Sequence, residues 1–465
     1  MSQLAVSEAF DPRDPRARVH AVLDDADPSV VHDRPGTGVL TALGTVDGAP
    51  AAVFATDPRS QGGALGRDGC LAIAALYETA RAEARAIVGV WQSGGARLAE
   101  GAASLDGVGR VFAAMTAASG EIPQISVVLG PAAGGAAYGP ALTDAVVLGP
   151  NGRVFVTGPD VVRTVTGEEV DMERLGGPEP HGRRSGVAHV VTDSDDDALV
   201  TARRLVSLLR APGRVHRVTG SAISQLLPAE PRRAYDVRPI VAALLDHGSP
   251  LELHPRWAPN MVTTLGRIGG GSVGVLANNP MRLGGCLDAS SAEKAARFVR
   301  TCDVFGLPLV VLVDVPGYLP GLAQEWDGVV RRGAKLLHAF AEAAVPRVTV
   351  VTRKAYGGAY IAMNSRALGA TTVLAWPRAE IAVMGAVAAV RILHRRRLSA
   401  VPDEERPHAE ADLAAAHERN SGGLDRAVDL GLVDDVIEPD RTRAAVSAAL
   451  ADRVVNRGRH RNIPL

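Results

Sequence analysis

The sequence is poor in cysteine and has no long apolar run, and each shortage excludes a class of protein. Its three cysteines, Cys70, Cys286 and Cys302, lie far apart and include no CxxC pair. This excludes a four-thiolate zinc site and favours isolated thiols in a reducing compartment. No apolar run reaches the roughly 18–20 residues that cross a bilayer, and the polar start has no signal-peptide pattern. We expect a cytoplasmic protein with no membrane partner and no bound metal.

A charge excess of either sign is also missing. The 50 basic and 51 acidic residues give a formal net charge of −1, so the chain as a whole offers no basic field for nucleic acid. Hydrophobic residues make up 46% of the chain and charged residues 22%, as in a globular protein. With 465 residues, the chain is too long for one ordinary core, and we expect two or three domains.

What the sequence does contain is an internal repeat. Six short motifs recur in order, shifted by 221 to 223 positions. The clearest pair is Gly134-Gly135-Ala136 and Gly357-Gly358-Ala359. The others are Leu43-Gly44 with Leu265-Gly266, Asp47-Gly48 with Gly269-Gly270, Asp57-Pro58 with Asn279-Pro280, Asp106-Gly107-Val108 with Asp327-Gly328-Val329, and Pro123 with Pro346. A duplication of this kind indicates two copies of one domain. We predict an N-terminal domain over 1–216, a proline-containing linker over 217–238 and a C-terminal domain over 239–465.

Each copy predicts the same series of elements. A hairpin over 39–46 and 51–56 turns at Asp47-Gly48. Helices and short apolar strands then alternate: helix 69–85, strand 86–91, helix 106–119 and strand 124–129, repeated as 291–305, 307–313, 327–344 and 347–352. Continuous apolar strands that alternate with helices indicate parallel pairing, and hence an α/β fold. The charged stretch 393–420 predicts a solvated helical insertion.

The repeated Gly-Gly-Ala motif follows a buried strand at the start of a probable helix. Small residues there let a ligand approach amide groups that have no partner inside the helix, which is the geometry of an oxyanion hole. The loops Ser93–Arg97 and Asp314–Tyr318 end the neighbouring strands and could add a second donor to each site. Close packing of a helix on a sheet also requires glycine, but the recurrence in both copies favours the oxyanion reading.

No other catalytic constellation competes with these loops. Ser93 does not lie in a GxSxG elbow, and no Walker motif occurs. Asp144, Asp314, Glu100 and His338 could each act as an acid or base, but a structural role is favoured for each. The sequence thus predicts two anion-stabilising sites without an obvious base.

Several long motifs resemble the acyl-CoA carboxylase carboxyltransferase family, and more narrowly its actinobacterial acetyl-/propionyl-CoA carboxylase β subunits. They are Cys286–Arg300 (CLDASSAEKAARFVR), Val313–Leu336 (VDVPGYLPGLAQEWDGVVRRGAKL), Thr352–Ala362 (TRKAYGGAYIA), Ala375–Ala386 (AWPRAEIAVMGA), Trp91–Gly101 (WQSGGARLAEG) and Gly134–Asp144 (GGAAYGPALTD). The resemblance covers nearly the whole chain after about residue 11.

The resemblance implies two tandem crotonase-like (ClpP/crotonase) ββα-superhelix domains, and a homo-hexamer with each active site between the first domain of one protomer and the second domain of another. Gly134 and Gly135 would stabilise the thioester enolate, and Gly358 and Ala359 the ureido oxygen of biotin. The biotin nitrogen would take the α-proton, which explains the missing base. The substrate-binding residues by this resemblance are Gly94, Gly95, Ala96, Arg97, Tyr138, Gly317, Tyr318 and Ile361.

Substrate length is expected to depend on Ile361, because propionyl-preferring relatives commonly have aspartate there. We expect acetyl-CoA as the main substrate, with propionyl-CoA also accepted. Val387 and Arg391 depart from the polar or small residues of many relatives, so the approach of biotin could differ.

The sequence contains neither a Met-Lys-Met biotinylation motif nor an ATP-grasp loop. Carboxybiotin is therefore expected to arrive on a separate biotinylated α subunit, with coenzyme A entering as part of the acyl-CoA substrate. Three alternatives stay open: a decarboxylase that runs the reaction backwards on malonyl- or methylmalonyl-CoA, a crotonase-type hydratase or hydrolase, and a non-catalytic assembly subunit.

Overall fold

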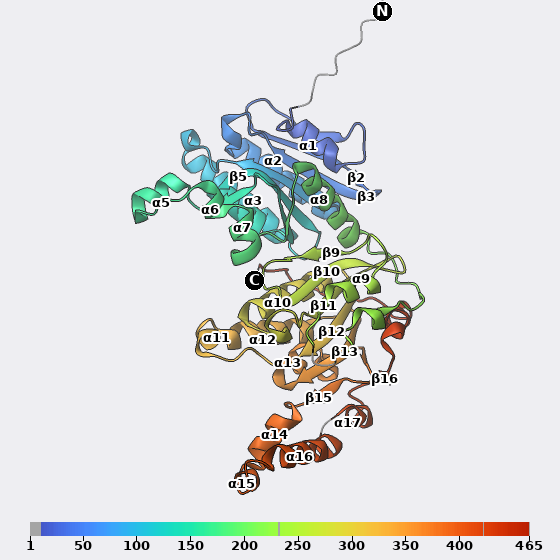
Figure 1. Cartoon of the computed structure of the whole chain (residues 1–465). Coiled ribbons are helices and arrows are strands. Elements are labelled where there is room, and N and C mark those ends of the chain that lie inside the picture. Colours follow the sequence, from blue (N-terminus) through green and yellow to red (C-terminus); the bar gives the residue numbers. More distant parts are fainter. Residues whose placement is uncertain (1–10, 231–232, 422, 465) are drawn as a thin grey trace, which may run out of the picture. The chain divides into compact units, whose positions relative to one another are not determined.

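The computed structural model describes residues 11–230, 233–421 and 423–464, which form two compact units (Figure 1). The first unit runs to Ala211 and also includes the C-terminal segment Arg459–Pro464. The second unit is Pro212–Gly458. The internal repeat does not predict that this C-terminal segment belongs to the first unit.

The first unit is built on one sheet with the strand order β1-β2-β3-β4-β5-β6-β8, and β7 pairs beyond it with β5. The strands are β1 (Ser29–His32), β2 (Val39–Val46), β3 (Ala49–Thr56), β4 (Ala86–Ser93), β5 (Gln124–Ala133), β6 (Ala145–Leu148), β7 (Arg153–Phe155) and β8 (Val190–Val191). The main helices are α1 (Pro15–Val22), α2 (Arg67–Ala82), α3 (Ala102–Ala118), α4 (Gly135–Ala141), α5 (Pro159–Thr166), α6 (Met172–Gly176), α7 (Pro178–Pro180) and α8 (Asp195–Arg210).

The second unit repeats this plan with the order β16-β14-β13-β12-β11-β10-β9, and β15 pairs with β13. Its strands are β9 (Leu251–Leu253), β10 (Met261–Ile268), β11 (Gly271–Asn278), β12 (Leu309–Val315), β13 (Arg347–Tyr356), β14 (Thr372–Ala375), β15 (Glu380–Ala382) and β16 (Asp435–Val436). Its helices are α9 (Arg238–Leu244), α10 (Ala289–Val304), α11 (Leu322–Trp326), α12 (Val329–Glu342), α13 (Gly357–Ala362), α14 (Ala386–Leu393), α15 (Arg395–Ser399), α16 (Arg406–Ser421), α17 (Leu424–Asp429) and α18 (Thr442–Ala451).

The two sheets correspond strand for strand. In each, an antiparallel hairpin (β2–β3 or β10–β11) leads into parallel strands that are connected by helices. This is the predicted α/β architecture of two copies of one domain, and the prediction is confirmed. The carboxyl ends of the parallel strands meet at one edge of each sheet, where ligands of such folds bind.

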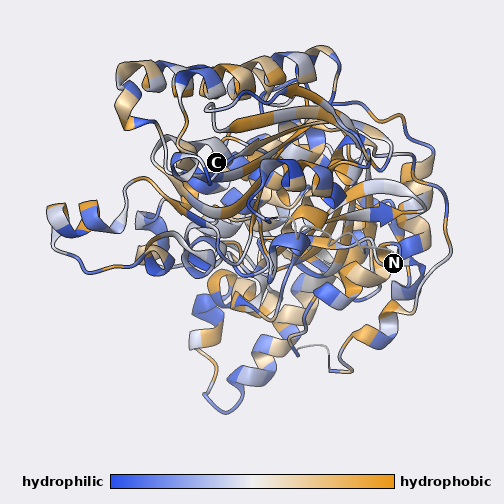
Figure 2. Ribbon diagram, turned by 90° about the horizontal axis from the view of Figure 1, so that it is seen from above, coloured by the Kyte–Doolittle hydropathy of each residue, from blue (hydrophilic) through white to orange (hydrophobic). Residues whose placement is uncertain are grey.

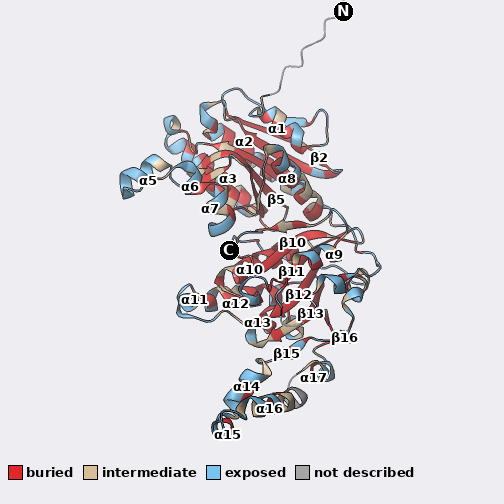
Figure 3. Ribbon diagram, viewed as in Figure 1, coloured by how far each residue is buried: buried red, intermediate tan, exposed pale blue. Residues whose placement is uncertain are grey.

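Apolar side chains between sheet and helices form a separate core in each unit. Figure 2 shows hydrophobic colour along the strands, and Figure 3 shows that the strands are mostly buried. In the first unit, Trp91 crosses Phe54 edge to face at 5.0 Å, and its indole N–H donates to Ser126 Oγ at 2.9 Å. The edge-to-face contact and the satisfied indole N–H fix this large side chain beneath the strand end that carries the site.

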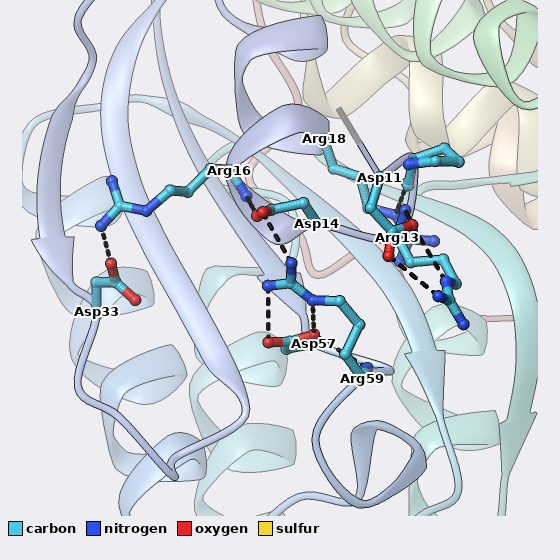
Figure 4. Close-up of polar contacts among 9 residues, drawn as sticks. Asp11, Arg13, Asp14, Arg16, Arg18, Asp33, Asp57 and Arg59 are labelled. Carbon is cyan, nitrogen blue, oxygen red and sulfur yellow. Dashed lines mark hydrogen bonds and ion pairs between the residues drawn. The ribbon is translucent and has the colours of Figure 1, made fainter. Parts of the chain in front are cut away.

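The first unit begins with α1, whose start is tied to the β3 end by an arginine (Figure 4). The Arg59 guanidinium donates to Asp14 at 2.8 Å and to Asp57 at 2.9 Å. Because these groups are partly exposed, we expect this cluster to contribute little to stability.

The charged stretch near the end of the second unit is helical, as its composition predicts. Helices α14, α15 and α16 form it, and an ion pair between Arg391 and Glu410 at 2.8 Å joins α14 to α16. Val387 and Arg391 are both exposed on α14.

Two further observations concern the described residues as a whole. No helix among them is long and apolar enough to cross a membrane. Nor do the residues in 11–230, 233–421 and 423–464 include a group of three or more His, Cys, Asp or Glu side chains that could hold a metal ion.

Candidate active site

In both units a central parallel strand passes directly into a short helix at a glycine. Strand β5 leads into α4 through Gly134, with φ 55°, and β13 leads into α13 through Gly357, with φ 58°. Residues with a Cβ rarely adopt this left-handed conformation, so glycine is needed at both turns. The turn aims the first amides of each helix away from the strand.

The amides at the first of these turns differ in their use. Gly134 donates its N–H to the carbonyl of Phe155 at 3.2 Å and supplies the turn. Its predicted contact with the thioester enolate stays a prediction. Gly135 and Ala136 follow as the first residues of α4, where amides have no acceptor within the helix, and neither donates to another described backbone carbonyl.

A second donor comes from the loop that follows β4. Gly94 donates to Gly62 O at 3.1 Å and Gly95 to Ser93 Oγ at 3.2 Å, so both amides are occupied. Ala96 pairs with Leu65 in a short parallel bridge. Leu65 donates to Gly95 O and accepts from the Arg97 N–H, so the Ala96 N–H has no acceptor among the described backbone carbonyls. A Cβ on Gly95 would lie 2.9 Å from the carbonyl of Ala133. The absence of that Cβ lets this loop contact the β5 end, and we name the amides of Ala96, Gly135 and Ala136 the first cradle.

The second unit repeats the arrangement. Leu287 pairs with Tyr318 in the same way as Leu65 pairs with Ala96. The Leu287 N–H donates to Gly317 O at 3.1 Å, and the Leu287 carbonyl accepts from the Leu319 N–H at 2.7 Å. The Tyr318 N–H between them donates to no backbone carbonyl among the described residues. A Cβ built on Gly358 meets no heavy atom within 4 Å, which shows open space there. The amides of Tyr318, Gly358 and Ala359 form the second cradle.

The Arg97 side chain lies inside the first unit. It is buried, with only 9% of the residue exposed, and its Nε donates to Ala64 O at 3.0 Å. The guanidinium also lies 3.4 Å from a carboxylate oxygen of Glu100. This side chain supports the loop of the first cradle from inside, and its binding to substrate stays a prediction.

An apolar pocket of about 380 Å³ is lined in part by Ala137, Tyr138 and Ala141 of α4, the helix that begins at Gly135. Its lining includes Tyr138 of α4, Phe155 at the end of β7 and the partly buried imidazole of His181. Burial lowers the pKa of His181, and its ring nitrogens are occupied by Val154 O at 2.6 Å and Ser185 Oγ at 2.7 Å. Tyr138 is half exposed and meets Phe112 edge to face at 6.5 Å. The pocket offers an apolar chain a place to bind next to α4.

The second cradle has a different neighbour. Ile361 occupies the position in α13 that Tyr138 occupies in α4, and 46% of it is exposed. The ring of Tyr318 packs over Gly333 of α12, where a Cβ would lie 3.1 Å from the phenolic oxygen. Burial raises the pKa of Tyr318 to about 12, so this phenol stays protonated.

The four candidate acids and bases are all engaged in the fold or exposed. Asp144 accepts from the Gln124 amide at 2.8 Å and from Asn462 Nδ2 at 2.6 Å. Asp314 accepts from the Lys354 amide at 3.2 Å. Glu100 accepts from the Arg67 amide at 2.6 Å. The remaining candidate, His338, is exposed on α12 and lies 3.7 Å from Glu342. None is placed as the general base of a cradle.

Sequence reasoning missed Lys294, which is almost fully buried in α10. Its ammonium donates to the carbonyls of His254, Trp257, Ala258 and Met261 at 2.6–3.3 Å. Burial lowers its pKa to about 7. The lysine fixes the loop before β10, and nothing in its local sequence distinguishes it from an exposed helical lysine.

Comparisons with known proteins agree along almost the full length of the chain. Residues 7–461 match the model of the carboxyl transferase domain. The biotin-dependent acetyl-/propionyl-coenzyme A carboxylase beta6 subunit of Mycobacterium tuberculosis is 60% identical over 470 residues, which cover 100% of this chain and 99% of the relative. The propionyl-CoA carboxylase beta chain of Rhodococcus erythropolis is 57% identical over 463 residues, covering 98% and 97%.

A solved structure has the same fold. The hexameric transcarboxylase 12S, with methylmalonyl-coenzyme A and methylmalonic acid bound, matches with a TM-score of 0.89 at 38% identity. The match covers 97% of this chain and 92% of that one.

Proposed function

The chain belongs to the carboxyl transferase domain family and is the carboxyltransferase β subunit of a biotin-dependent acetyl-/propionyl-CoA carboxylase, and from this premise we propose that its two cradles divide the reaction between them. The first cradle takes the acyl-CoA thioester and the second takes the ureido group of biotin. The observation that carries this division is the duplicated set of open amides, one set at each strand–helix turn.

The first cradle stabilises negative charge on the thioester oxygen. Amide groups fixed before the reaction lose little energy in reorientation when the α-carbon loses its proton and the oxygen becomes an enolate. Ala96 and Gly135 supply the donors, and the apolar pocket beside Tyr138 receives an apolar part of the acyl-CoA. The enolate carbon would then bond to the CO2 released when the N–C bond of carboxybiotin breaks, and the α-proton would pass to the ureido nitrogen left free by that cleavage.

The second cradle fits a ureido oxygen. Tyr318, Gly358 and Ala359 leave main-chain donors open, and the space beside Gly358 is empty of protein atoms. Biotin, when bound, supplies the carboxyl group and a ureido nitrogen of sufficient basicity to accept a proton. The residues of this chain hold the ureido oxygen and thus stabilise the charge that develops there. No side chain among Asp144, Asp314, Glu100 and His338 is needed as a base.

We further propose a homo-hexamer with shared sites, in which the first cradle of one protomer meets the second cradle of another. The hexameric assembly of transcarboxylase 12S supports this proposal. The biotin is carried by a biotinylated α subunit, and the carboxylase relatives support such a partner.

Reconstitution tests the proposal directly. The purified chain is combined with a biotinylated α subunit, ATP and bicarbonate, and acetyl-, propionyl- and butyryl-CoA are offered in turn. We expect malonyl-CoA and methylmalonyl-CoA formation that depends on the biotinylated partner. If the partner becomes carboxylated but no acyl-CoA product forms, the proposal is wrong.

A further inference from the structure

The strand before each cradle contains the same irregularity. In the second unit, Val313 pairs with Val351 and Val315 with Ala355, so β13 carries two extra residues opposite Asp314. In the first unit, β5 has the same excess opposite Gln92. Beyond this bulge each strand changes its outer partner, from β14 to β15 and from β6 to β7. The bulge therefore aims the strand end, and with it the cradle.

Gln92 and Asp314 occupy equivalent places opposite the two bulges. The N–H of Gln92 donates to Thr56 Oγ1 at 2.8 Å, and that of Asp314 donates to Asn278 Oδ1 at 3.3 Å. The main chain at both positions is thus held in the same way, by a polar side chain at the end of the neighbouring strand. The side chains of Gln92 and Asp314 can therefore be compared for how each bulge treats the main-chain N–H of its last residue.

The two bulges differ in the main-chain N–H of their last residue. The last bulge residue in the second unit is Lys354, and its N–H donates to the carboxylate of Asp314 at 3.2 Å. The corresponding residue in the first unit is Pro131, which has no N–H. Gln92 accordingly has no such amide to satisfy, and its side-chain oxygen Oε1 accepts from Arg18 at 2.6 Å instead. The bulge of the first unit thus lacks this donor because proline has no N–H, whereas in the second unit the Asp314 carboxylate accepts from it.

We propose that Asp314 is the positioning residue of the second cradle. Its carboxylate joins β12 to the bulge of β13, and Val315 then pairs with Ala355, so the Tyr318 loop and the Gly358 turn keep their spacing. Asp314 is only 5% exposed, and it acts through the main chain without contacting substrate. Arg353, whose Nε is 4.0 Å from the carboxylate, is its nearest cationic neighbour. This inference rests on the proposed assignment of biotin to the second cradle.

The chain itself suggests the test, because the first unit shows how to remove the amide. Asp314→Ala leaves the Lys354 N–H without an acceptor, and we expect kcat for transfer from the biotinylated partner to fall about 10²-fold, since small displacements of such groups cost that much. The KM for acyl-CoA, which binds the first cradle, should stay unchanged. In Asp314→Ala/Lys354→Pro the unsatisfied donor is gone, and most of the lost rate should return.

Two controls separate positioning from general damage. Asp314→Ala/Lys354→Ala removes the same side chains but keeps the amide, so it should stay as slow as Asp314→Ala. Asp303→Ala removes another buried carboxylate of the second unit, which accepts the amides of Ala344 and Val345 before β13 begins. That variant should lower the melting temperature without changing kcat.

The outcomes decide between the possibilities. Full activity of Asp314→Ala, no recovery with proline, or an equal kinetic loss in Asp303→Ala would each overturn the inference. If Asp314→Ala does not fold, the proposal still requires Asp314→Ala/Lys354→Pro to fold and to transfer, and its failure to do so counts against it. An inactive wild-type chain with a carboxylated partner would instead disprove the proposed function.

Discussion

At the scale of single residues, Gly358 offers the most direct test of the second cradle. A Cβ there meets no protein atom within 4 Å and φ is not in the left-handed region, so Gly358→Ala should fold normally. The added methyl group enters the open space beside the amide where the ureido oxygen is proposed to bind. We expect kcat to fall about 10²-fold, as when one oxyanion donor is lost, with no change in melting temperature.

Gly109 is the matched control for this substitution. It lies exposed on α3, and its Cβ would also meet nothing within 4 Å. Gly109→Ala should leave kcat unchanged and raise the unfolding free energy by up to about 1 kcal/mol, because alanine favours a helix over glycine. Equal kinetics in the two variants would contradict the assignment of Gly358.

Ile361 carries the prediction of substrate preference. It lies two residues beyond Ala359 and is half exposed beside the second cradle. Ile361→Asp should shift the ratio of kcat/KM for acetyl-CoA and propionyl-CoA toward propionyl-CoA by about tenfold, the scale of discrimination that one methylene group allows. Ile361→Val keeps an apolar side chain and should leave the ratio nearly as it is. An unchanged ratio in Ile361→Asp would remove this residue from the specificity argument.

At the scale of elements, much of each domain could be predicted from the sequence because hydrophobic periodicity and turn residues are local signals. The hairpin, both long helices and the parallel strands lie where the repeat places them. The central strands are longer than predicted: the predicted strand ends at residue 129, whereas β5 continues to Ala133. Pro131 is allowed there because it lies in the bulge, where β5 is not paired with β4.

The loop before β10 shows what local sequence cannot reveal. His254 and Ala258 have φ of 53° and 44°, an unfavourable conformation for residues with a Cβ. The buried ammonium of Lys294 holds their carbonyls. The contacts span 33–40 positions in the chain, so no periodicity or motif predicts them.

Lys294→Met should therefore destabilise the second unit. The substitution leaves buried carbonyls without a donor, and we expect the unfolding free energy to fall by about 2–4 kcal/mol. Lys335→Met is the control, because Lys335 pairs with Glu293 while 27% of its side chain is exposed, and its loss should cost about 1 kcal/mol or less. Urea titration at pH 6.5 measures both.

The same lysine predicts a pH dependence. Burial lowers its pKa from 10.5 in the unfolded chain to about 7 in the native state. Between these values the unfolded state binds more protons at this site, so its contribution to the unfolding free energy should rise with pH. Comparing wild type with Lys294→Met at pH 7 and pH 9 isolates this effect. A difference between the two proteins that does not grow with pH would contradict it.

At the scale of the whole molecule, the repeat indicated two copies of one domain but not how the chain closes. Segment Arg459–Pro464 belongs to the first unit, where Asn462 is fully buried and donates to Asp144 at 2.6 Å. This contact joins positions 318 residues apart. The candidate site was partly predictable for a related reason: the glycine turns are motifs, but which amides remain open depends on pairing across strands. The Gly134 N–H, for example, is used by Phe155 O of the neighbouring strand, which no motif reveals.

The proposed sharing of sites between protomers can be tested by complementation. Ala96→Pro removes one donor of the first cradle, and Gly358→Ala impairs the second. If each site uses the first cradle of one protomer and the second of another, random co-assembly of the two variants should restore roughly a quarter of the wild-type activity per chain. If both cradles of a site came from one chain, this mixture would stay inactive. Co-assembly of wild type with the double variant Ala96→Pro/Gly358→Ala gives the reciprocal measurement: roughly a quarter for shared sites, but roughly half for sites within one chain.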